Sequence, residues 1–469
     1  MSHPAHLRDR AETNGGVSFW WADIGRPPLR APLPPGERSA DVCIVGAGFT
    51  GLWTAYHLKR ERPELEVVVL EREFAGFGAS GRNGGWLTDR FAASSDTVAA
   101  IGGRAGATAL RAALRDSVDE VLAVCEREEI EADIVRSGVL RVARGQAQAR
   151  RLHALHEKER GWGDGADHAV ELGPEQLRAR IRIPDGMLGL FDAHGARVHP
   201  AKLARGLAGA VEGLGVSIYE GTAVHDVGPG YARAGAGIVR SPTVLTCLEG
   251  FLSDLPGRRR ARLPLNSAMV VTAPLPAAIW DKIGWEGSEL LGDCAHAYTY
   301  AQRTADGRIA LGGRGVPYRY ASRIDDRGRT QTGTVRSLIS ALHDQFPAAA
   351  GVPVEHAWCG VLGVARDWFP AVGLDRATGL GGAGGYVGNG VGASHLAART
   401  LCDLMLDVDS ERTQLPWVGH EARRWEPEPL RWIGVQLVYA LYRAADRRER
   451  RGDGHTSWFA RAADLIAGR

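Results

Sequence analysis

A run of glycines directly after a short apolar segment constrains this chain more than any other feature. Residues 41–45 read DVCIV, which suits a buried parallel strand. Gly46, Gly48 and Gly51 follow with GxGxxG spacing, and the next residues, LWTAYHLKR, predict a helix. In such a unit the first glycine permits a tight turn, the second lets a phosphate approach the backbone, and the third lets helix and strand pack closely. The sequence therefore predicts a βαβ unit that binds a pyrophosphate.

An acidic residue ends the second strand of this unit. Residues 66–70 read EVVVL, and Glu71 follows, twenty positions after Gly51. A carboxylate there would accept hydrogen bonds from both ribose hydroxyls of a dinucleotide. It would repel the extra phosphate of NADP, so the motif favours NAD or FAD without separating the two.

Composition excludes several other classes of protein. With 469 residues, 44% of them hydrophobic and 24% charged, the chain suits a globular protein of two domains. A net charge of +2 gives no field for nucleic acid. The six cysteines show no CxxC and no cluster at metal-binding spacing, so we expect reduced thiols, a cytoplasmic location and no metal. No apolar run is long enough to predict a membrane span.

The order of patterns along the chain predicts an α/β fold with an added sheet. Residues 26–37 are rich in proline, so we expect the folded core to begin near Ala40, with an arm before it. The tail from Trp425 predicts a short apolar helix followed by a basic one. Glycines cluster at 46–51, 76–85 and 381–392, helical patterns cover 107–128 and 200–214, and alternating patterns cover 138–143 and 297–302.

The segment after Glu71 resembles a known family. Residues 73–85 read EFAGFGASGRNGG, which resembles the D-amino-acid oxidase superfamily of flavoproteins, and within it the γ-glutamylputrescine oxidase and glycine or sarcosine oxidase group. At 242–250, PTVLTCLEG, the family usually has an apolar strand followed by Thr or Gly, and Cys247, Leu248 and Glu249 depart from that pattern. Further similar segments follow in the family's order at 193–207, 217–224, 358–360, 367–373 and 385–394, so that the resemblance spans roughly 17–443.

The resemblance implies an FAD-binding Rossmann-like domain of the D-amino-acid oxidase type, with a second, substrate domain built on a mixed β-sheet. On this basis we expect a discontinuous FAD-binding domain, a substrate domain formed by the pieces between, and a C-terminal helical tail. The expected bounds are 38–95, 198–255 and 352–412 for the FAD-binding domain, 96–197 and 256–351 for the substrate domain, and 413–469 for the tail.

The same resemblance implies which residues bind FAD. In the sarcosine oxidase branch a cysteine carries the flavin, but counting back from Asp367 the matching position here is Gly360, so we expect non-covalent FAD rather than attachment to Cys359. A helix that starts near Gly390 would stabilise negative charge on reduced flavin. The expected FAD-binding residues are Gly46, Gly48, Phe49, Thr50, Glu71, Arg72, Gly78, Ala79, Ser80, Asn83, Gly84, Gly85, Trp86, Val224, Gly360, Gly388, Asn389, Gly390, Val391, Gly392 and Ala393.

Substrate-binding residues are less clearly marked. His296, Tyr298 and Tyr300 alternate and are predicted to share one strand face. We expect the two tyrosines to line the substrate pocket, and Arg314 or Arg82 to hold a carboxylate with two hydrogen bonds. The alternative is that the tyrosines pack in the core and the arginines form surface ion pairs.

The implied activity is FAD-dependent oxidation of the C–N bond of a small amine or amino acid, giving an imine and then a carbonyl product. The acceptor stays open between oxygen, which would give hydrogen peroxide, and a quinone or redox protein, because no lysine matches the one that the sarcosine oxidase branch uses with oxygen. A flavin-binding protein without amine turnover is the other alternative. The basic C-terminal helix is compatible with peripheral membrane contact or with packing on the body.

Overall fold

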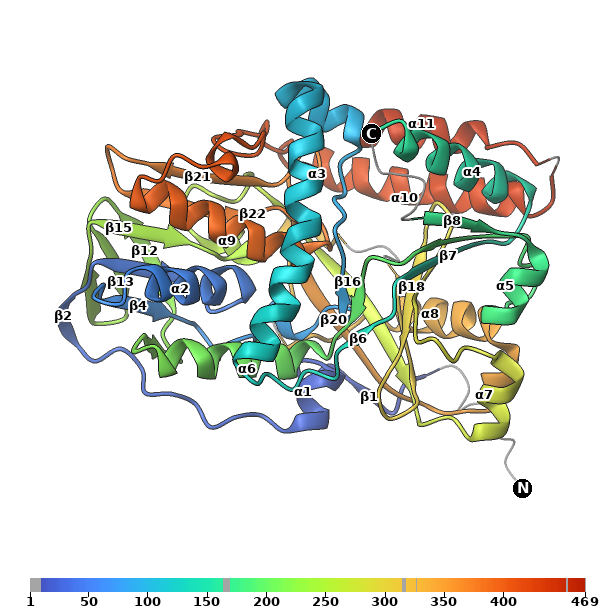
Figure 1. The fold of residues 1–469 in the computed structure, drawn as a ribbon, viewed down its shortest axis with the longest axis horizontal. Coiled ribbons are helices and arrows are strands. Elements are labelled where there is room, and N and C mark those ends of the chain that lie inside the picture. Colours follow the sequence, from blue (N-terminus) through green and yellow to red (C-terminus); the bar gives the residue numbers. More distant parts are fainter. Residues whose placement is uncertain (1–9, 163–168, 314–317, 326, 453, 469) are drawn as a thin grey trace.

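The computed structural model describes residues 10–162, 169–313, 318–325, 327–452 and 454–468. Two large sheets lie next to each other, with helices over their faces (Figure 1). The predicted α/β fold class is confirmed.

The glycine motif belongs to a six-stranded sheet that is parallel except for its last strand, β21, which runs antiparallel to β22. Helices α2 (Phe49–Glu61), α6 (Pro200–Gly213) and α9 (Gly390–Leu406) bury one face. The strands, in spatial order, are β11 (Ser217–Tyr219), β4 (Val67–Leu70), β3 (Val42–Val45), β15 (Thr243–Thr246), β22 (Leu380–Gly384) and β21 (Ala371–Asp375).

Both faces of this sheet are buried, which explains why its strands read as continuous apolar runs. Val42 and Ile44 pack toward the helices, whereas Cys43 and Val45 pack toward a small second sheet. The strands of that small sheet are β12 (Val224–Gly228), β13 (Tyr231–Ala234), β14 (Gly237–Arg240) and β2 (Gly36–Ser39). The strands predicted at 41–45 and 66–70 are confirmed.

A nine-stranded mixed sheet forms the other half of the molecule, and helices α5 (Pro174–Arg180), α7 (Ala277–Ile283) and α8 (Thr332–Gln345) cover one of its faces. Its long strand β20 lies within the predicted FAD-binding segment 352–412, yet pairs along its length with β16. The domain bounds therefore stay a prediction. The strands, in spatial order, are β1 (Thr13–Asn14), β20 (Val354–Val364), β16 (Leu263–Thr272), β19 (Ile309–Gly313), β18 (Thr299–Arg303), β17 (Leu290–Asp293), β7 (Val139–Ala143), β9 (Leu188–Asp192) and β8 (Ala169–Leu172).

A three-stranded sheet and helix α3 (Ser95–Arg127) lie between the halves, whereas helix α4 (Gln146–Arg160) packs against β7 and β9 of the nine-stranded sheet. The strands of the small sheet are β5 (Trp86–Leu87), β10 (Ala196–Arg197) and β6 (Val135–Arg136). Helix α3 is interrupted at Gly103, where φ is 73°. The predicted helices at 107–128 and 200–214 are confirmed by α3 and α6.

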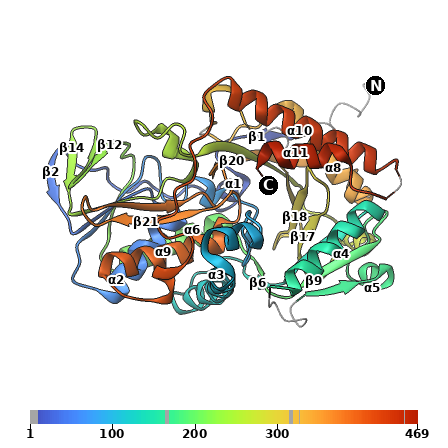
Figure 2. The ribbon, with the colours of Figure 1, turned by 90° about the horizontal axis from the view of Figure 1, so that it is seen from above.

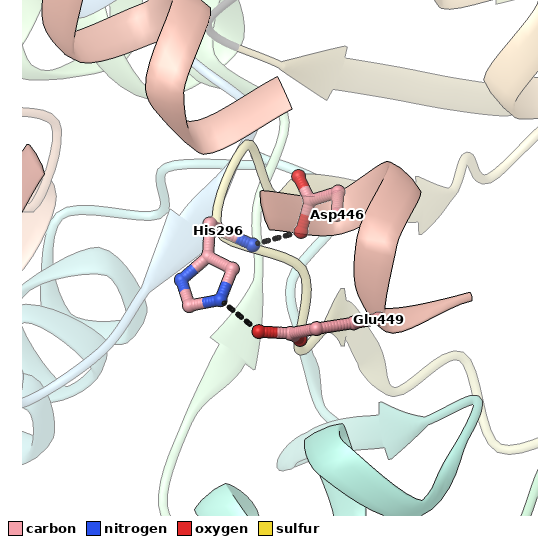
Figure 3. Close-up of side chains that lie close together, drawn as sticks. All are labelled: His296, Asp446 and Glu449. Carbon is pink, nitrogen blue, oxygen red and sulfur yellow. Dashed lines mark hydrogen bonds and ion pairs between the residues drawn. The ribbon is translucent and has the colours of Figure 1, made fainter. Parts of the chain in front are cut away.

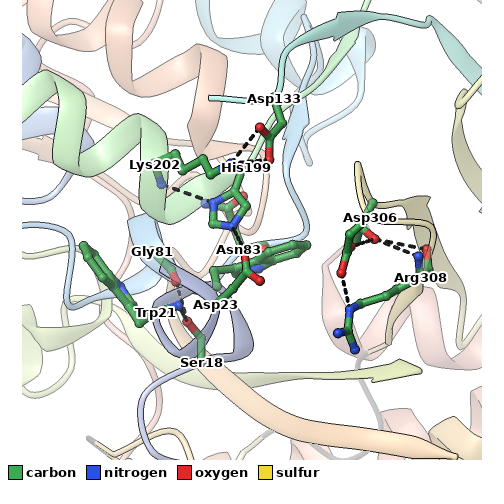
Figure 4. Close-up of polar contacts among 12 residues, drawn as sticks. Ser18, Trp21, Asp23, Gly81, Asn83, Asp133, His199, Lys202, Asp306 and Arg308 are labelled. Atoms are coloured by element: carbon green, nitrogen blue, oxygen red, sulfur yellow. Dashed lines mark hydrogen bonds and ion pairs between the residues drawn. The ribbon is translucent and has the colours of Figure 1, made fainter. Parts of the chain in front are cut away.

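Residues 17–21, in the segment before Ala40, belong to the core, so the prediction of an arm was wrong for them. Trp20 and Trp21, on the short helix α1 (Phe19–Ile24), are each 1% exposed. Ser18 donates a 2.8 Å hydrogen bond to the carbonyl oxygen of Gly81 in the glycine-rich loop (Figure 4). The proline-rich stretch suggested an arm, and nothing in the sequence indicated that Trp20 and Trp21 are buried, because their burial depends on partners far away in the chain.

The C-terminal segment forms helices α10 (Leu430–Glu449) and α11 (Trp458–Ala467), which lie next to each other along one outer face (Figure 2). The predicted pair of an apolar and a basic helix was wrong: both patterns lie on α10, because no glycine or proline breaker separates them. In the part of the chain that the structure describes, no helix is long and apolar enough to cross a membrane.

Candidate functional site

The predicted phosphate turn lies where the parallel strands of the six-stranded sheet end. Gly46 follows β3 with a φ of 106°, and a Cβ atom there would lie 2.6 Å from the carbonyl oxygen of Cys247. A Cβ on Gly51 would lie 2.0 Å from the carbonyl oxygen of Gly46. Glycine alone fits these positions without a shift of the backbone. The turn brings the start of α2 to the point between β3 and β15 where the strand order reverses, which is where open α/β sheets bind ligands.

A cavity opens at this edge of the sheet, with about 1130 Å³ of empty space when the part open to solvent is included. Its wall includes the phosphate turn, the end of β4, the glycine-rich loop and the start of α9. The expected cofactor residues in the wall are Gly46, Gly48, Phe49, Thr50, Glu71, Arg72, Gly78, Ala79, Ser80, Asn83, Val224, Gly388, Gly390 and Val391. The remaining ones, which lie outside this lining, are Gly84, Gly85, Trp86, Gly360, Asn389, Gly392 and Ala393.

Two helices begin at the cavity. The N–H of Phe49, the first residue of α2, donates a 2.8 Å hydrogen bond to Ser80 Oγ in the opposite wall. The loop before α9 is joined to α2 by a 3.0 Å hydrogen bond between the hydroxyls of Thr50 and Tyr386. Because the amino end of a helix carries partial positive charge and N–H groups without helical partners, both ends favour an anionic ligand.

Glu71 lies at the end of β4, as predicted, and lines the cavity. Its carboxylate oxygens accept hydrogen bonds from the backbone N–H groups of Ala47, at 2.9 Å, and Glu73, at 3.0 Å. Burial raises the pKa of Glu71, and these two hydrogen bonds act in the opposite direction. The carboxylate is therefore fixed beside the phosphate turn.

Comparison with known proteins decides which ligand this cavity serves. The model of the family described as FAD dependent oxidoreductase (DAO) matches residues 41–404. The chain belongs to this family. γ-Glutamylputrescine oxidoreductase of Escherichia coli (strain K12) is 30% identical over 381 residues, which cover 80% of this chain and 85% of the relative.

Two further proteins are similar over most of their length. The β subunit of sarcosine oxidase from Rhodobacter capsulatus is 24% identical over 403 residues, covering 81% of this chain and 90% of its own. The crystal structure of glycine oxidase from Geobacillus kaustophilus has a TM-score of 0.67 at 20% identity, and covers 79% of this chain and 96% of its own. The predicted family, fold class and FAD cofactor are confirmed.

The residues of the cavity fit FAD. The turn at Gly46–Gly48 and the start of α2 would hold the pyrophosphate, and Glu71 would accept hydrogen bonds from ribose hydroxyls. The glycine-rich loop around Ser80 and the start of α9 at Gly390 would hold the flavin ring. The partial positive charge at the start of α9 would favour the negative charge that a reduced flavin carries.

The surroundings of Cys359 do not favour a reactive thiol, and non-covalent FAD stays a prediction. Its thiol lies 3.5 Å from the carbonyl oxygen of Arg329, within the core under α8. Burial raises the pKa of Cys359 to about 11, so that the reactive thiolate is disfavoured. Gly360 is the next residue of β20, so a side chain there would point to the opposite face of the strand from Cys359. A Cβ atom on Gly360 would lie 3.3 Å from Arg82 Cβ.

The end of the glycine-rich loop joins the cofactor side to the nine-stranded sheet. A Cβ on Gly84 would lie 2.6 Å from the ring of Tyr300, and a Cβ on Gly85 would lie 2.1 Å from Gln302 Nε2. Gln302 donates a 2.6 Å hydrogen bond to the carbonyl oxygen of Gly84. These glycines therefore permit close contact between loop and sheet.

Of the two arginines predicted to hold a substrate carboxylate, only Arg82 lies among the described residues, and its role stays a prediction. Arg82 is 1% exposed, and its Nε donates a 2.7 Å hydrogen bond to the carbonyl oxygen of Phe77. Its guanidinium also lies 4.3 Å from the centre of the Phe77 ring, so its described contacts brace the loop. Arg314 lies outside the described residues, and its role stays a prediction.

Tyr300 alone of the three alternating residues lies on strand β18. Its hydroxyl is 3.2 Å from Ser267 Oγ, on the sheet face next to Gly84. The prediction that His296 and Tyr298 share this strand face was wrong, because both residues lie in the loop before the strand. Asp446 of α10 holds this loop, since its carboxylate accepts hydrogen bonds from the backbone N–H groups of His296 and Ala297 (Figure 3). Pocket roles for Tyr298 and Tyr300 stay predictions.

Sequence reasoning missed part of the cavity wall, including the whole segment that follows β15 directly. Glu249 is the residue of most consequence: its carboxylate accepts hydrogen bonds from the N–H groups of Gly363, at 3.0 Å, and Gly385, at 2.8 Å. Its departure from the family pattern was the available signal. The missed lining residues are Val45, Leu70, Phe77, Thr222, Cys247, Leu248, Glu249, Phe251, Asp254, Leu255, Leu362, Tyr386 and Ser394.

A buried histidine pair links the two helices that begin at the cavity. His57 of α2 and His395 of α9 have their Nε2 atoms 3.0 Å apart, so one must donate and the other accept. Burial lowers the pKa of His395 to about 3 and that of His57 well below 6.5. Both rings are therefore neutral in the folded protein at neutral pH.

This pair predicts a loss of stability in mild acid. Below about pH 6.5 the unfolded chain binds protons at both histidines while the folded chain does not, so the free energy of unfolding should fall by up to about 1.4 kcal/mol per pH unit for each. Urea unfolding between about pH 7.5 and 5 measures the slope. His395→Gln should reduce the slope, and His225→Gln, at an exposed position, should not. Equal slopes in all three proteins would contradict the prediction.

Proposed function

We propose that this FAD-dependent oxidoreductase oxidises the carbon–nitrogen bond of a small amine or amino acid. The observation that carries the proposal is the 30% identity to γ-glutamylputrescine oxidoreductase over 85% of that protein, together with an intact cavity for FAD. The names of the other relatives, sarcosine oxidase and glycine oxidase, support the same class of substrate.

The sheet face beside the glycine-rich loop suits such a reaction. Tyr300 packs on Gly84 and forms an edge-to-face contact with Trp86, with ring centres 5.9 Å apart. If these rings exclude water from the bound substrate, desolvation would disfavour a charged ammonium group and help the amine to react in its neutral form. Bound FAD supplies the two-electron oxidation, and the imine product hydrolyses to a carbonyl compound in water.

Anaerobic reduction of the purified holoenzyme tests this proposal. We expect amines, polyamine conjugates, amino acids and N-methyl amino acids to include compounds that bleach the flavin band, and alcohols of equal length to leave it unchanged. Readmission of air then shows whether oxygen accepts the electrons. A yellow protein that no amine bleaches would contradict the proposal and favour a flavin-binding protein without amine turnover.

The acceptor divides the proposal into two forms. Rapid recovery of the flavin band in air, with hydrogen peroxide, identifies an oxidase. Slow recovery in air and rapid recovery with a soluble quinone identifies a dehydrogenase, which is the alternative that sequence reasoning left open.

The cellular setting also belongs to the proposal. We place the enzyme in the cytoplasm, and the six free cysteines support a reducing compartment. Peripheral membrane contact through the C-terminal helices is supported by exposed apolar side chains with arginines further along α10. The exposed apolar residues are Leu430, Trp432, Ile433, Leu437, Trp458, Leu465 and Ile466.

A further inference from the structure

Strand β7 places an arginine on the sheet face that carries Tyr300. Arg141 pairs with Gly292 of β17, and Gly292 pairs with Tyr300 of β18, so the three residues form one row across the sheet. The neighbours of Arg141 on its strand, Leu140 and Val142, pack on the opposite face with α5 and α8. Arg141 therefore shares the face that contacts the glycine-rich loop.

The missing side chain of Gly292 leaves room between two groups. From the position of a Cβ on Gly292, Trp86 Cη2 lies 3.5 Å away and Arg141 Cγ lies 3.9 Å away. The other edge of the same indole ring lies 3.6 Å from the Cβ position of Gly84. The ring of Trp86 thus spans the distance from the cofactor loop to Arg141.

Both groups carry hydrogen-bond donors without protein acceptors. Trp86 Nε1 is buried and has no partner among the described residues. Within the same described part of the chain, Arg141 has no hydrogen bond, ion pair or ring contact. A buried indole N–H normally finds a partner, and the half-buried guanidinium of Arg141 lies beside it with donors of its own, so the two together mark a place for an acceptor.

The nearby carboxylates do not neutralise Arg141, because other arginines hold them. Asp192 lies 2.6 Å from Arg90, and Glu159 lies 2.6 Å from Arg111. The positive charge of Arg90, together with burial, lowers the pKa of Arg141 to about 10, which still leaves it charged at neutral pH. The row thus keeps one cation in excess, and an anion bound there would relieve an unpaired charge.

We propose that Arg141 and Trp86 bind a carboxylate of the substrate, and that the preferred substrates are amines whose carboxylate lies several bonds from the oxidised carbon. A guanidinium matches a carboxylate with two parallel hydrogen bonds, and the indole N–H supplies a third. Arg141 and Tyr300 lie on strands two apart, a separation of about 10 Å, which suits an elongated substrate better than an α-amino acid. This inference rests on the proposed function and names its substrate class.

The test compares ω-amino acids, from β-alanine upward, with n-alkylamines of equal length on the holoenzyme. The wild type should prefer the longer ω-amino acids in kcat/KM by about 10- to 100-fold. Arg141→Met should remove the preference, Arg141→Lys should keep part of it, and Trp86→Phe should weaken it. Arg178→Met removes an equal charge from an exposed site on α5 and should leave the preference intact.

A binding measurement separates this inference from the proposed function. An aliphatic dicarboxylate, which cannot be oxidised, should perturb the flavin spectrum on binding, and Arg141→Met should raise its Kd by about 10- to 100-fold. If no amine reduces the flavin but the dicarboxylate binds through Arg141, the anion site stands and the proposed reaction falls. If amines reduce the flavin with equal preference in wild type and Arg141→Met, and the Kd is unchanged, the inference is overturned.

Discussion

The Gly46→Ala variant is expected to fold but to be purified without its flavin, with affinity for FAD reduced about 100-fold or more. Gly46 has a φ of 106°, which costs an alanine about 1–3 kcal/mol, and the new methyl group would lie 2.6 Å from the carbonyl oxygen of Cys247. The turn must open to relieve this contact, and its N–H groups then no longer converge on the pyrophosphate. Titration of the apoprotein with FAD, followed by flavin fluorescence, measures the change.

Gly209→Ala is the matched control for this variant. Gly209 lies within α6, where an added methyl group meets no atom within 4 Å, so this variant should bind FAD as the wild type does. Its thermal stability should be equal or higher, because alanine suits a helix better than glycine. A yellow Gly46→Ala protein with wild-type affinity would show that the turn does not carry the pyrophosphate.

The second large effect is expected for Glu249→Ala, which should lower the free energy of unfolding by about 3 kcal/mol. The change leaves the N–H groups of Gly363 and Gly385 without acceptors and removes the carboxylate 4.0 Å from Arg262. Since Glu249 lines the FAD cavity, bound FAD should recover part of the loss. Urea unfolding with and without added FAD measures both effects.

Glu249→Gln distinguishes the hydrogen bonds from the charge. Glutamine retains one carbonyl acceptor, so it should lose less stability than alanine. Glu64→Ala removes a carboxylate from an exposed pair with Arg62 and should leave the free energy of unfolding close to that of the wild type. A Glu249→Ala protein as stable as Glu64→Ala would contradict the role assigned to this carboxylate.

Local patterns predicted the half of the site that binds phosphate and ribose. The strand, the glycines at 46, 48 and 51, and Glu71 are contiguous in sequence, and their spacing fixes their relative positions through bonds within one βαβ unit. The loop with Ser80 and the start of α9 at Gly390 were reached through a resemblance rather than through periodicity. Gly46, Gly48, Glu71, Ser80 and Gly390 all line one cavity.

The remaining features depend on contacts between distant segments. Trp20 is buried although the chain before Ala40 reads as an arm, and His296 is drawn off the strand by Asp446 of a helix 150 residues later. Arg141 carries no local signal at all. Its position beside Trp86 follows from how the strands β7, β17 and β18 are ordered in the sheet.

The sequence by itself thus determined the family, the cofactor and the turn that receives its pyrophosphate, because each depends on residues close together in the chain. The tertiary structure alone decided which side chains share the sheet face beside the glycine-rich loop. The pairing of strands decides this, because two residues lie side by side across a sheet only if their strands are neighbours in the right register. No short sequence motif contains that information.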